Sequence, residues 1–183
     1  GSFEALQAVG DRHANRRIAM VMYAANAQNI QRVLNAVAPA HALKIITIGH
    51  PGTTLAIRDW LDGGGLVGML GDRFLQEGKD PGDVMRLPFL GHDAPFGLGP
   101  LRLAMLLQRR VFFMTALLRG GNRYEVRFEP LADFSQRPAD AAAREQQLHA
   151  ALQAYVHKLE ALCVEAPYNW FNFHDFWTED VSH

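Results

Sequence analysis

The residues Asp72-Arg73 follow the apolar run LVGML and one glycine, and they are the first pair in the chain whose types and place could do chemistry. Ligands of open α/β sheets bind beyond the carboxyl ends of the strands. A charged pair in that place could bind an anion or stabilise charge that develops during a reaction. A salt bridge that pins the loop explains the pair equally well.

The segment APFGLGP, residues 94–100, places Gly97 and Gly99 near the expected start of a helix. Backbone N–H groups in such a place can approach a phosphate or carbonyl oxygen. The segment is neither a P-loop nor a GxGxxG motif. Taken alone, it is better explained as a turn into a helix with Pro100 in its first turn.

The histidines, serines and the single cysteine form no recognised catalytic or metal-binding motif. None of the eight histidines stands in HExxH or another ligand spacing, and no serine stands in GxSxG. Adjacent residues of an extended chain point to opposite faces, so His92-Asp93 and His174-Asp175 are poor candidates for direct dyads. Cys163 falls on the apolar stripe of a long predicted helix, which favours a packed thiol.

These candidates must be positioned by alternating strands and helices. Residues 71–98, between the strand over 66–70 and the helix over 99–108, are expected to be a loop that is polar at first and apolar towards its end. Strands are predicted over residues 17–23, 44–48, 66–70, 111–118 and 123–129, and helices over 26–37, 53–61, 99–108 and about 139–163.

This order of elements predicts an α/β fold, with a mostly parallel central sheet and helices on both of its faces. VFFMTALL shows no alternation, so both of its faces are expected to be covered. RYEVRFE alternates, and it is expected to form one antiparallel edge hairpin with VFFMTALL across Gly120-Gly121-Asn122. The aromatic segment 167–177 is interpreted as anchored by its rings, with a substrate-contacting edge as the alternative.

Composition bounds the classes of function. The 183 residues are 49% hydrophobic and 20% charged, with a formal net charge of −1. One domain over residues 1–183 is expected, and no overall basic charge indicates a nucleic-acid partner. One cysteine allows no intrachain disulfide and no cysteine-rich zinc site. No apolar run approaches the roughly 18 residues that span a bilayer.

Three segments in order resemble the bacterial lysophospholipid acyltransferase-like superfamily, in particular its lipid A biosynthesis (lauroyl/myristoyl) branch. They are GGGLVGMLGDR, RLPFLGHDAPFGLGPLRLA and RYEVRFEPL. The tail NWFNFHDFW is more similar to relatives associated with aryl polyene pathways. The resemblance extends over essentially the whole chain and implies a glycerolipid acyltransferase-like fold.

The family carries an HxxxxE motif, and Gly1-Ser2-Phe3-Glu4 resembles its end, with Ser2 where asparagine is usual. Glu4 then matches the acidic member, and the histidine is expected just before Gly1. The chain is therefore expected to lack the catalytic-histidine segment and the N-terminal membrane anchor of the family. Gly97 and Arg110 stand where the family often has proline.

The resemblance implies roles for named residues. The family histidine would take a proton from an acceptor hydroxyl, and Glu4 would hold its ring and stabilise the imidazolium. Arg73, with backbone N–H groups near residues 97–99, is expected to stabilise the oxyanion or a substrate phosphate, beside Asp72. The residues expected to line a groove for the acyl tail or to bind substrate are Phe89, Leu90, Pro95, Phe96, Gly97, Leu98 and Gly99.

The implied activity is transfer of a fatty acyl group from acyl carrier protein, or acyl-CoA, to a hydroxyl of a lipid or glycolipid. No metal or redox cofactor is implied. The expected partners are acyl carrier protein, the lipid acceptor and a membrane surface reached through the anchor, at the cytoplasmic face of a bacterial inner membrane. The alternative is a non-catalytic lipid- or carrier-binding domain of the same fold. A nucleotide-binding domain lacks a credible phosphate loop.

Overall fold

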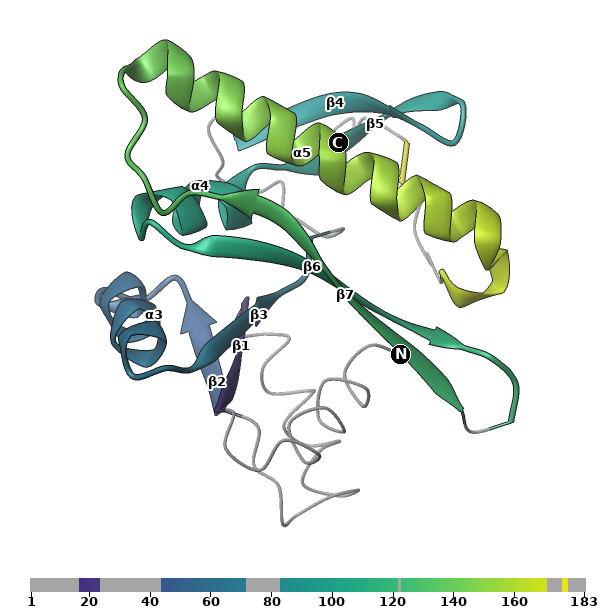
Figure 1. The fold of residues 1–183 in the computed structure, drawn as a ribbon, viewed down its shortest axis with the longest axis horizontal. Helices are drawn as coiled ribbons and strands as arrows, with labels where there is room; N and C mark the ends of the chain where they lie inside the picture. The colour runs from purple at the N-terminus through teal and green to yellow at the C-terminus, as the bar shows by residue number, and fades with distance from the viewer. Residues whose placement is uncertain (1–16, 24–43, 72–82, 122, 171–175, 178–183) are drawn as a thin grey trace, which may run out of the picture. The chain divides into compact units, whose positions relative to one another are not determined.

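The computed structural model describes residues 17–23, 44–71, 83–121, 123–170 and 176–177, and these form a mixed α/β structure (Figure 1). The chain divides into two compact units, a first unit of residues 2–70 and a second unit of residues 71–183. The described strands form a three-stranded parallel sheet and two antiparallel hairpins. The predicted α/β class is confirmed at this level.

The first unit contains the parallel sheet, in the order β2-β1-β3. Its strands are β1 (Ile18–Tyr23), β2 (Lys44–Ile48) and β3 (Leu66–Met69), within one residue of the predicted bounds. The central strand β1 pairs in parallel with both neighbours, and its residues 19–22 are buried. A continuous apolar run is what a strand covered on both faces requires.

Helix α3 (Thr53–Asp62) confirms the second predicted helix, and Gly63 is its C-cap. Its Trp60 ties the helix to the sheet, because the indole Nε1 donates a hydrogen bond to the carbonyl oxygen of Leu66 at 3.1 Å. The guanidinium of Arg17 lies 4.2 Å from the centre of the same ring. The helix predicted over residues 26–37 lies outside the described residues.

The prediction of a loop over residues 71–98 is wrong for its second half, which forms a hairpin. Strands β4 (Val84–Phe89) and β5 (His92–Gly97) pair in antiparallel register around a turn at Leu90 and Gly91. Pro88 and Pro95 disfavour a central strand, but among the described strands β4 and β5 pair only with each other. Each therefore has an edge at which proline leaves no ladder bond missing.

The second hairpin, β6 (Arg110–Leu118) with β7 (Tyr124–Asp133), confirms the predicted antiparallel pair. The prediction that β6 is covered on both faces is wrong. One face is apolar across both strands, and its members Phe112, Leu118 and Phe128 are 42%, 44% and 54% exposed. The described residues therefore leave this face of the hairpin partly exposed, although the apolar pattern of β6 predicts cover on both faces.

Helices α4 (Gly99–Leu106) and α5 (Ala141–Glu165) complete the second unit, followed by a short 3₁₀ turn, η2 (Pro167–Asn169). The Asp140 side chain caps α5 by accepting a hydrogen bond from the Ala143 N–H at 2.7 Å. Helix α5 packs against α4, β4 and β7, so it joins both hairpins (Figure 1).

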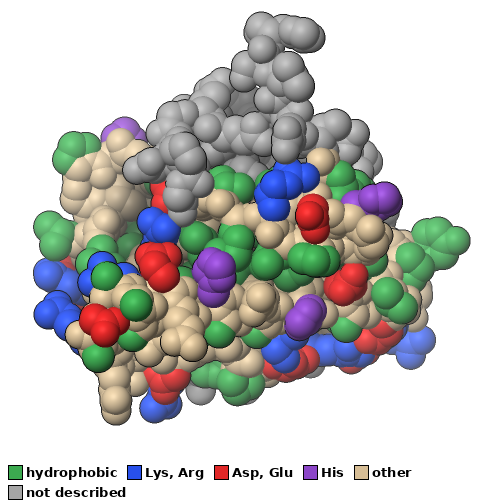
Figure 2. Space-filling view, turned by 90° about the horizontal axis from the view of Figure 1, so that it is seen from above, with side chains coloured by type: hydrophobic (Ala, Val, Ile, Leu, Met, Phe, Trp, Pro, Cys, Tyr) green, Lys and Arg blue, Asp and Glu red, His purple; other side chains and the backbone are tan. Residues whose placement is uncertain are grey.

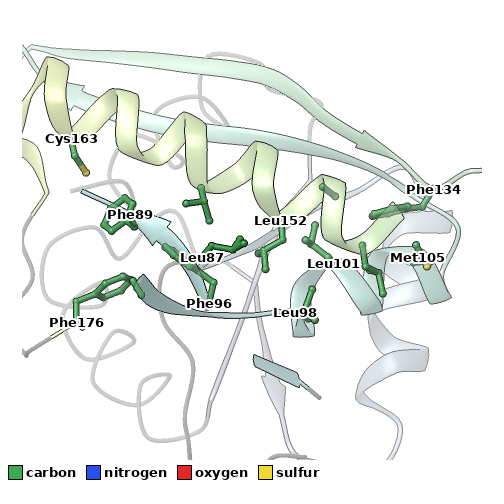
Figure 3. Close-up of a cluster of buried hydrophobic side chains, with 14 residues drawn as sticks. Leu87, Phe89, Phe96, Leu98, Leu101, Met105, Phe134, Leu152, Cys163 and Phe176 are labelled. Atoms are coloured by element: carbon green, nitrogen blue, oxygen red, sulfur yellow. The ribbon is translucent and has the colours of Figure 1, made fainter. Parts of the chain in front are cut away.

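The core of the second unit lies between α5 and the β4–β5 hairpin (Figure 3). Helix α5 contributes a stripe at helical spacing, as predicted, and the hairpin contributes aromatic rings. The buried members from these two sources are Leu87, Phe89, Ala94, Phe96, Leu148, Ala151, Leu152, Val156 and Cys163. The predicted packed state of the Cys163 thiol is confirmed.

Acidic and basic side chains of the described residues lie interspersed on the face that Figure 2 shows. No helix in the described part of the chain has the length and apolar character needed to cross a membrane.

Candidate functional site

Three residues of the predicted site, Glu4, Asp72 and Arg73, lie outside the described residues. The structure describes the flanking positions, Gly71 on one side of the charged pair and Asp83 at the start of the following hairpin. The described parts of the candidate site are these flanks and the segment 90–99.

Gly71, the residue before Asp72-Arg73, lies against Tyr155 of α5. A Cβ atom built on Gly71 would stand 2.8 Å from both Cζ and Oη of Tyr155 and 3.0 Å from Cε2. Real Cβ atoms do not approach other atoms so closely, so only glycine fits here without a shift of the ring or the backbone.

The same tyrosine contacts the hairpin that carries the predicted acyl-binding residues. Its ring centroid lies 6.4 Å from that of Phe96 at an interplanar angle of 78°, and 5.6 Å from that of Phe113 at 67°. Both arrangements are edge-on, which aromatic pairs favour. Tyr155 thus contacts both Gly71, the residue before the charged pair, and Phe96 of the segment APFGLGP.

Most of the side chains predicted to line an acyl groove are packed inside the core instead of facing solvent. Phe89, Phe96 and Leu98 are 0%, 1% and 2% exposed, and Figure 3 shows them within the cluster beneath α5. Pro95 and Gly97 are also buried, whereas Leu90 and Gly99 are half-buried.

The backbone near residues 97–99 was expected to offer N–H groups to a ligand. The N–H of Leu98 instead donates a hydrogen bond of 2.8 Å to the carbonyl oxygen of Asp83, and Gly97 pairs with Val84 in the hairpin register. The Asp83 carboxylate also forms an ion pair with Arg102 of α4, with Oδ1 and the guanidinium nitrogen 3.2 Å apart. These contacts fix where the segment enters α4, and the amide of Leu98 is occupied within the protein.

The aromatic tail is anchored by its rings, as predicted for the residues that the structure describes. Trp170, Phe176 and Trp177 surround Phe89, with ring centroids 5.3, 5.6 and 6.2 Å away. The indole Nε1 of Trp177 donates a hydrogen bond to the carbonyl oxygen of Phe89 at 3.2 Å. His174 and Asp175 lie outside the described residues.

The described histidines, His50, His92, His149 and His157, are all exposed. Within the described part of the chain, no three histidine, cysteine or acidic side chains cluster as metal ligands do.

The sequence analysis did not predict the ionic network that connects the β6–β7 hairpin with α5. Arg127 donates to both carboxylate oxygens of Glu165 at 2.6 Å and to Glu125 at 2.6 Å, and Arg119 bonds the same two acids. Hydrogen bonds from Arg127 and then Arg119 lower the pKa of Glu165 to about 2. The same arginines lower the pKa of Glu125. The network holds a helix onto a hairpin.

No model of a known protein family matches the chain, and no curated protein matches it either. Functional assignment therefore depends on the residues and on their arrangement.

Proposed function

We propose that the chain is an O-acyltransferase domain that moves a fatty acyl group from acyl carrier protein, or from acyl-CoA, to a hydroxyl of a lipid or glycolipid. The ordered segments that resemble the lysophospholipid acyltransferase-like superfamily support the proposal. The proposal includes the fold that the resemblance implies, with a mostly parallel central sheet and helices on both faces. It also includes the cytoplasmic face of a bacterial inner membrane as the place of action.

The proposed reaction is displacement at a thioester. A histidine, which the resemblance places before Gly1, removes the proton of the acceptor hydroxyl as its oxygen attacks the thioester carbonyl carbon. Glu4 orients that histidine and stabilises its imidazolium. Arg73 stabilises the tetrahedral oxyanion. The intermediate collapses with cleavage of the carbon–sulfur bond, and the thiolate leaving group takes the proton from the imidazolium.

The strongest structural support for the proposal comes from the contacts of Tyr155. The mechanism needs the charged pair and the segment APFGLGP to be close, and Tyr155 contacts both Gly71 and Phe96. This contact joins the flank of the pair to the segment, across a long separation in sequence. It supports a common site for the reacting group and the acyl chain.

The burial of the hairpin side chains limits how an acyl tail would be held. Phe89, Phe96 and Leu98 already fill the space beneath α5, so they act as the packed wall behind the site. Of the proposed acyl-contacting residues, the half-buried Leu90 and Gly99 are the ones that retain accessible surface. Each methylene that an acyl chain buries contributes about 0.8 kcal/mol.

The test is transfer of radiolabelled acyl groups by the full-length protein, with both donor types and a panel of lipid acceptors. We expect Arg73→Ala to lower kcat by about 10²- to 10³-fold, the loss typical of an oxyanion-hole donor. Arg58→Ala is the control, because Arg58 is exposed on α3 and pairs with its neighbour Asp59. Circular dichroism confirms that both variants fold.

Two results would overturn the proposal. Wild-type turnover by Arg73→Ala would remove Arg73 from the reaction. Absence of transfer by the wild-type protein with every donor and acceptor, together with measurable binding of acyl carrier protein or lipid, would favour the non-catalytic binding domain instead.

A further inference from the structure

We propose that Glu160 is a positioning residue for the acyl transfer, and that it holds Leu90 where the Leu90 side chain contacts the apolar tail of the acyl chain. The inference rests on the proposed function. The resemblance places Leu90 among the acyl-contacting residues, but it names no residue of α5 and gives no reason for the shape of the hairpin tip.

The first observation concerns the turn that joins β4 to β5. Phe89 pairs with His92, so the turn consists of Leu90 and Gly91 alone, and their φ angles are 51° and 85°. Positive φ at both positions is the pattern of a type I′ turn, which favours asparagine, aspartate or glycine in the first position. A leucine there is an outlier, because its Cβ crowds the backbone. Strain of this kind persists where the surroundings enforce it, and it gathers at functional sites.

The second observation is the hydrogen bond that enforces this conformation. Leu90 stands outside the strand register, and its N–H donates to Oε1 of Glu160 at 2.7 Å. A hydrogen bond to a charged carboxylate is roughly twice as strong as a neutral one. Glu160 belongs to α5, whose apolar stripe is packed into the core, so the acceptor is held by a rigid element. Glu160 therefore fixes the backbone of Leu90, and with it the direction of the side chain.

The third observation is the apolar surface around Leu90. Its neighbour Phe89 is fully buried, and the half-buried rings of Trp170 and Trp177 lie with their centroids 5.3 and 6.2 Å from the Phe89 ring. Leu90, Trp170 and Trp177 all pack against the core and keep part of their surface accessible. Such a surface suits a hydrocarbon chain, because each methylene that is buried improves binding about fourfold.

These observations together explain why a leucine stands in a turn that disfavours it. An asparagine would adopt the turn more easily, but it would place a polar amide on the apolar surface. Leucine keeps this surface apolar, and the hydrogen bond to Glu160 offsets the strain. The conformation of the tip then decides whether the Leu90 side chain meets the acyl tail.

The experiment measures KM and kcat of the full-length protein for a homologous series of saturated acyl donors. In the wild type, KM should fall as the chain lengthens, by up to about fourfold per methylene. Glu160→Ala should raise KM for the longest donors about 4- to 16-fold, the loss of one or two buried methylenes, and should flatten their length dependence. Its kcat should change less than about twofold, because this contact is made equally in the ground state and the transition state. Glu160→Gln keeps an acceptor oxygen and should retain most of the length dependence.

Leu90→Asn separates a role in binding from a role in folding. Asparagine followed by Gly91 is a favoured pair for this turn, so the variant should melt within about 4 °C of the wild type. It should nevertheless raise KM for the longest donors as Glu160→Ala does. Gln153→Ala, an exposed change on α5, is the matched control and should alter neither quantity. Wild-type length dependence in Leu90→Asn or in Glu160→Ala, with melting temperatures showing that both are folded, would overturn the inference.

Direct binding separates this inference from the proposed function. The probes are saturated fatty acids of the same lengths, and titration calorimetry gives their Kd. If the wild type binds them but transfers no acyl group, the proposed function fails, and a Kd about 4- to 16-fold weaker in Glu160→Ala still supports the positioning role. Absence of any length dependence in the wild type, in KM and in Kd alike, would refute the role given to Glu160.

Discussion

The backbone N–H of Leu90 donates a 2.7 Å hydrogen bond to the carboxylate of Glu160, 70 residues further along the chain. Leu90 stands at the tip of the β4–β5 hairpin with a φ angle of 51°, a left-handed conformation that costs a residue with a Cβ about 1–2 kcal/mol. The helix therefore holds the hairpin tip in a conformation that its own residue type disfavours.

Removal of the Glu160 carboxylate should destabilise the protein. We expect Glu160→Ala to lower the free energy of unfolding by about 1–2 kcal/mol, because it leaves the Leu90 amide without its charged acceptor. Glu160→Gln keeps an acceptor oxygen and should lose about half as much. Urea denaturation measures both. Gln153→Ala, an exposed change on α5, is the control, and equal stability of Glu160→Ala and this control would contradict the role given to Glu160.

The rings of Phe112 and Phe128 stack on the apolar face of the β6–β7 hairpin, with centroids 4.7 Å apart and planes 15° from parallel. A double-mutant cycle of Phe112→Ala and Phe128→Ala should give a coupling energy of about 0.5–1.5 kcal/mol. Each single change should cost less than in a core, because both rings are 42% exposed or more. Strictly additive losses would mean that the two rings do not interact.

The ionic network predicts a loss of stability in acid. Its arginines lower the pKa of Glu165 from 4.5 to about 2, so the folded state binds this proton less readily than the unfolded chain does. The stabilisation is therefore present above about pH 4.5 and is lost as the pH falls towards 2. The measurement is the free energy of unfolding against pH for wild type and Glu165→Gln.

The difference between the two curves should shrink as the pH falls through this window. High salt should also reduce it, because the pairs are solvent-accessible. A difference that stays constant down to pH 2 would show that Glu165 contributes through packing and not through its charge.

Gly65 predicts a steric cost in the first unit. A Cβ built there would overlap the Trp60 indole nitrogen and stand 2.8 Å from the Trp60 carbonyl oxygen. Gly65→Ala should displace the Trp60 ring, which donates a hydrogen bond to the Leu66 carbonyl oxygen. The free energy of unfolding should fall by about 1–3 kcal/mol. Gly99→Ala is the control for stability, because nothing lies within 4 Å of its Cβ position. A smaller loss from Gly65→Ala than from Gly99→Ala would contradict the packing described at Trp60.

The continuous apolar runs predicted β1, β2 and β3 to within a residue, because burial of a parallel strand on both faces imposes that pattern. The β4–β5 hairpin was missed for two physical reasons. Its strands contain Pro88 and Pro95, and its turn begins with Leu90 instead of the asparagine, aspartate or glycine that favours positive φ. The bond to Glu160 that supports this turn is invisible in the local sequence.

The alternation of RYEVRFE sorted the side chains of β7 into two sets correctly but did not indicate which set faces the helix. Arg127 and Glu129 face α5 because that helix offers Glu165 and Lys158 as partners. The contact of Tyr155 with Gly71 was equally beyond local patterns, since it depends on how α5 crosses the hairpins. The site residues Glu4, Asp72 and Arg73 stay predictions.

The hydrogen bond from the Trp177 indole to the Phe89 carbonyl oxygen has a consequence for biosynthesis. Translation runs from the amino end, so the hairpin with both of its prolines is made before α5 and before the last tryptophan. Until the segment with Trp177 is made, the ring of Phe89 lacks neighbours that enclose it. The nascent chain therefore exposes an apolar surface that chaperones recognise. Truncation before Trp177 should leave a product that aggregates during synthesis.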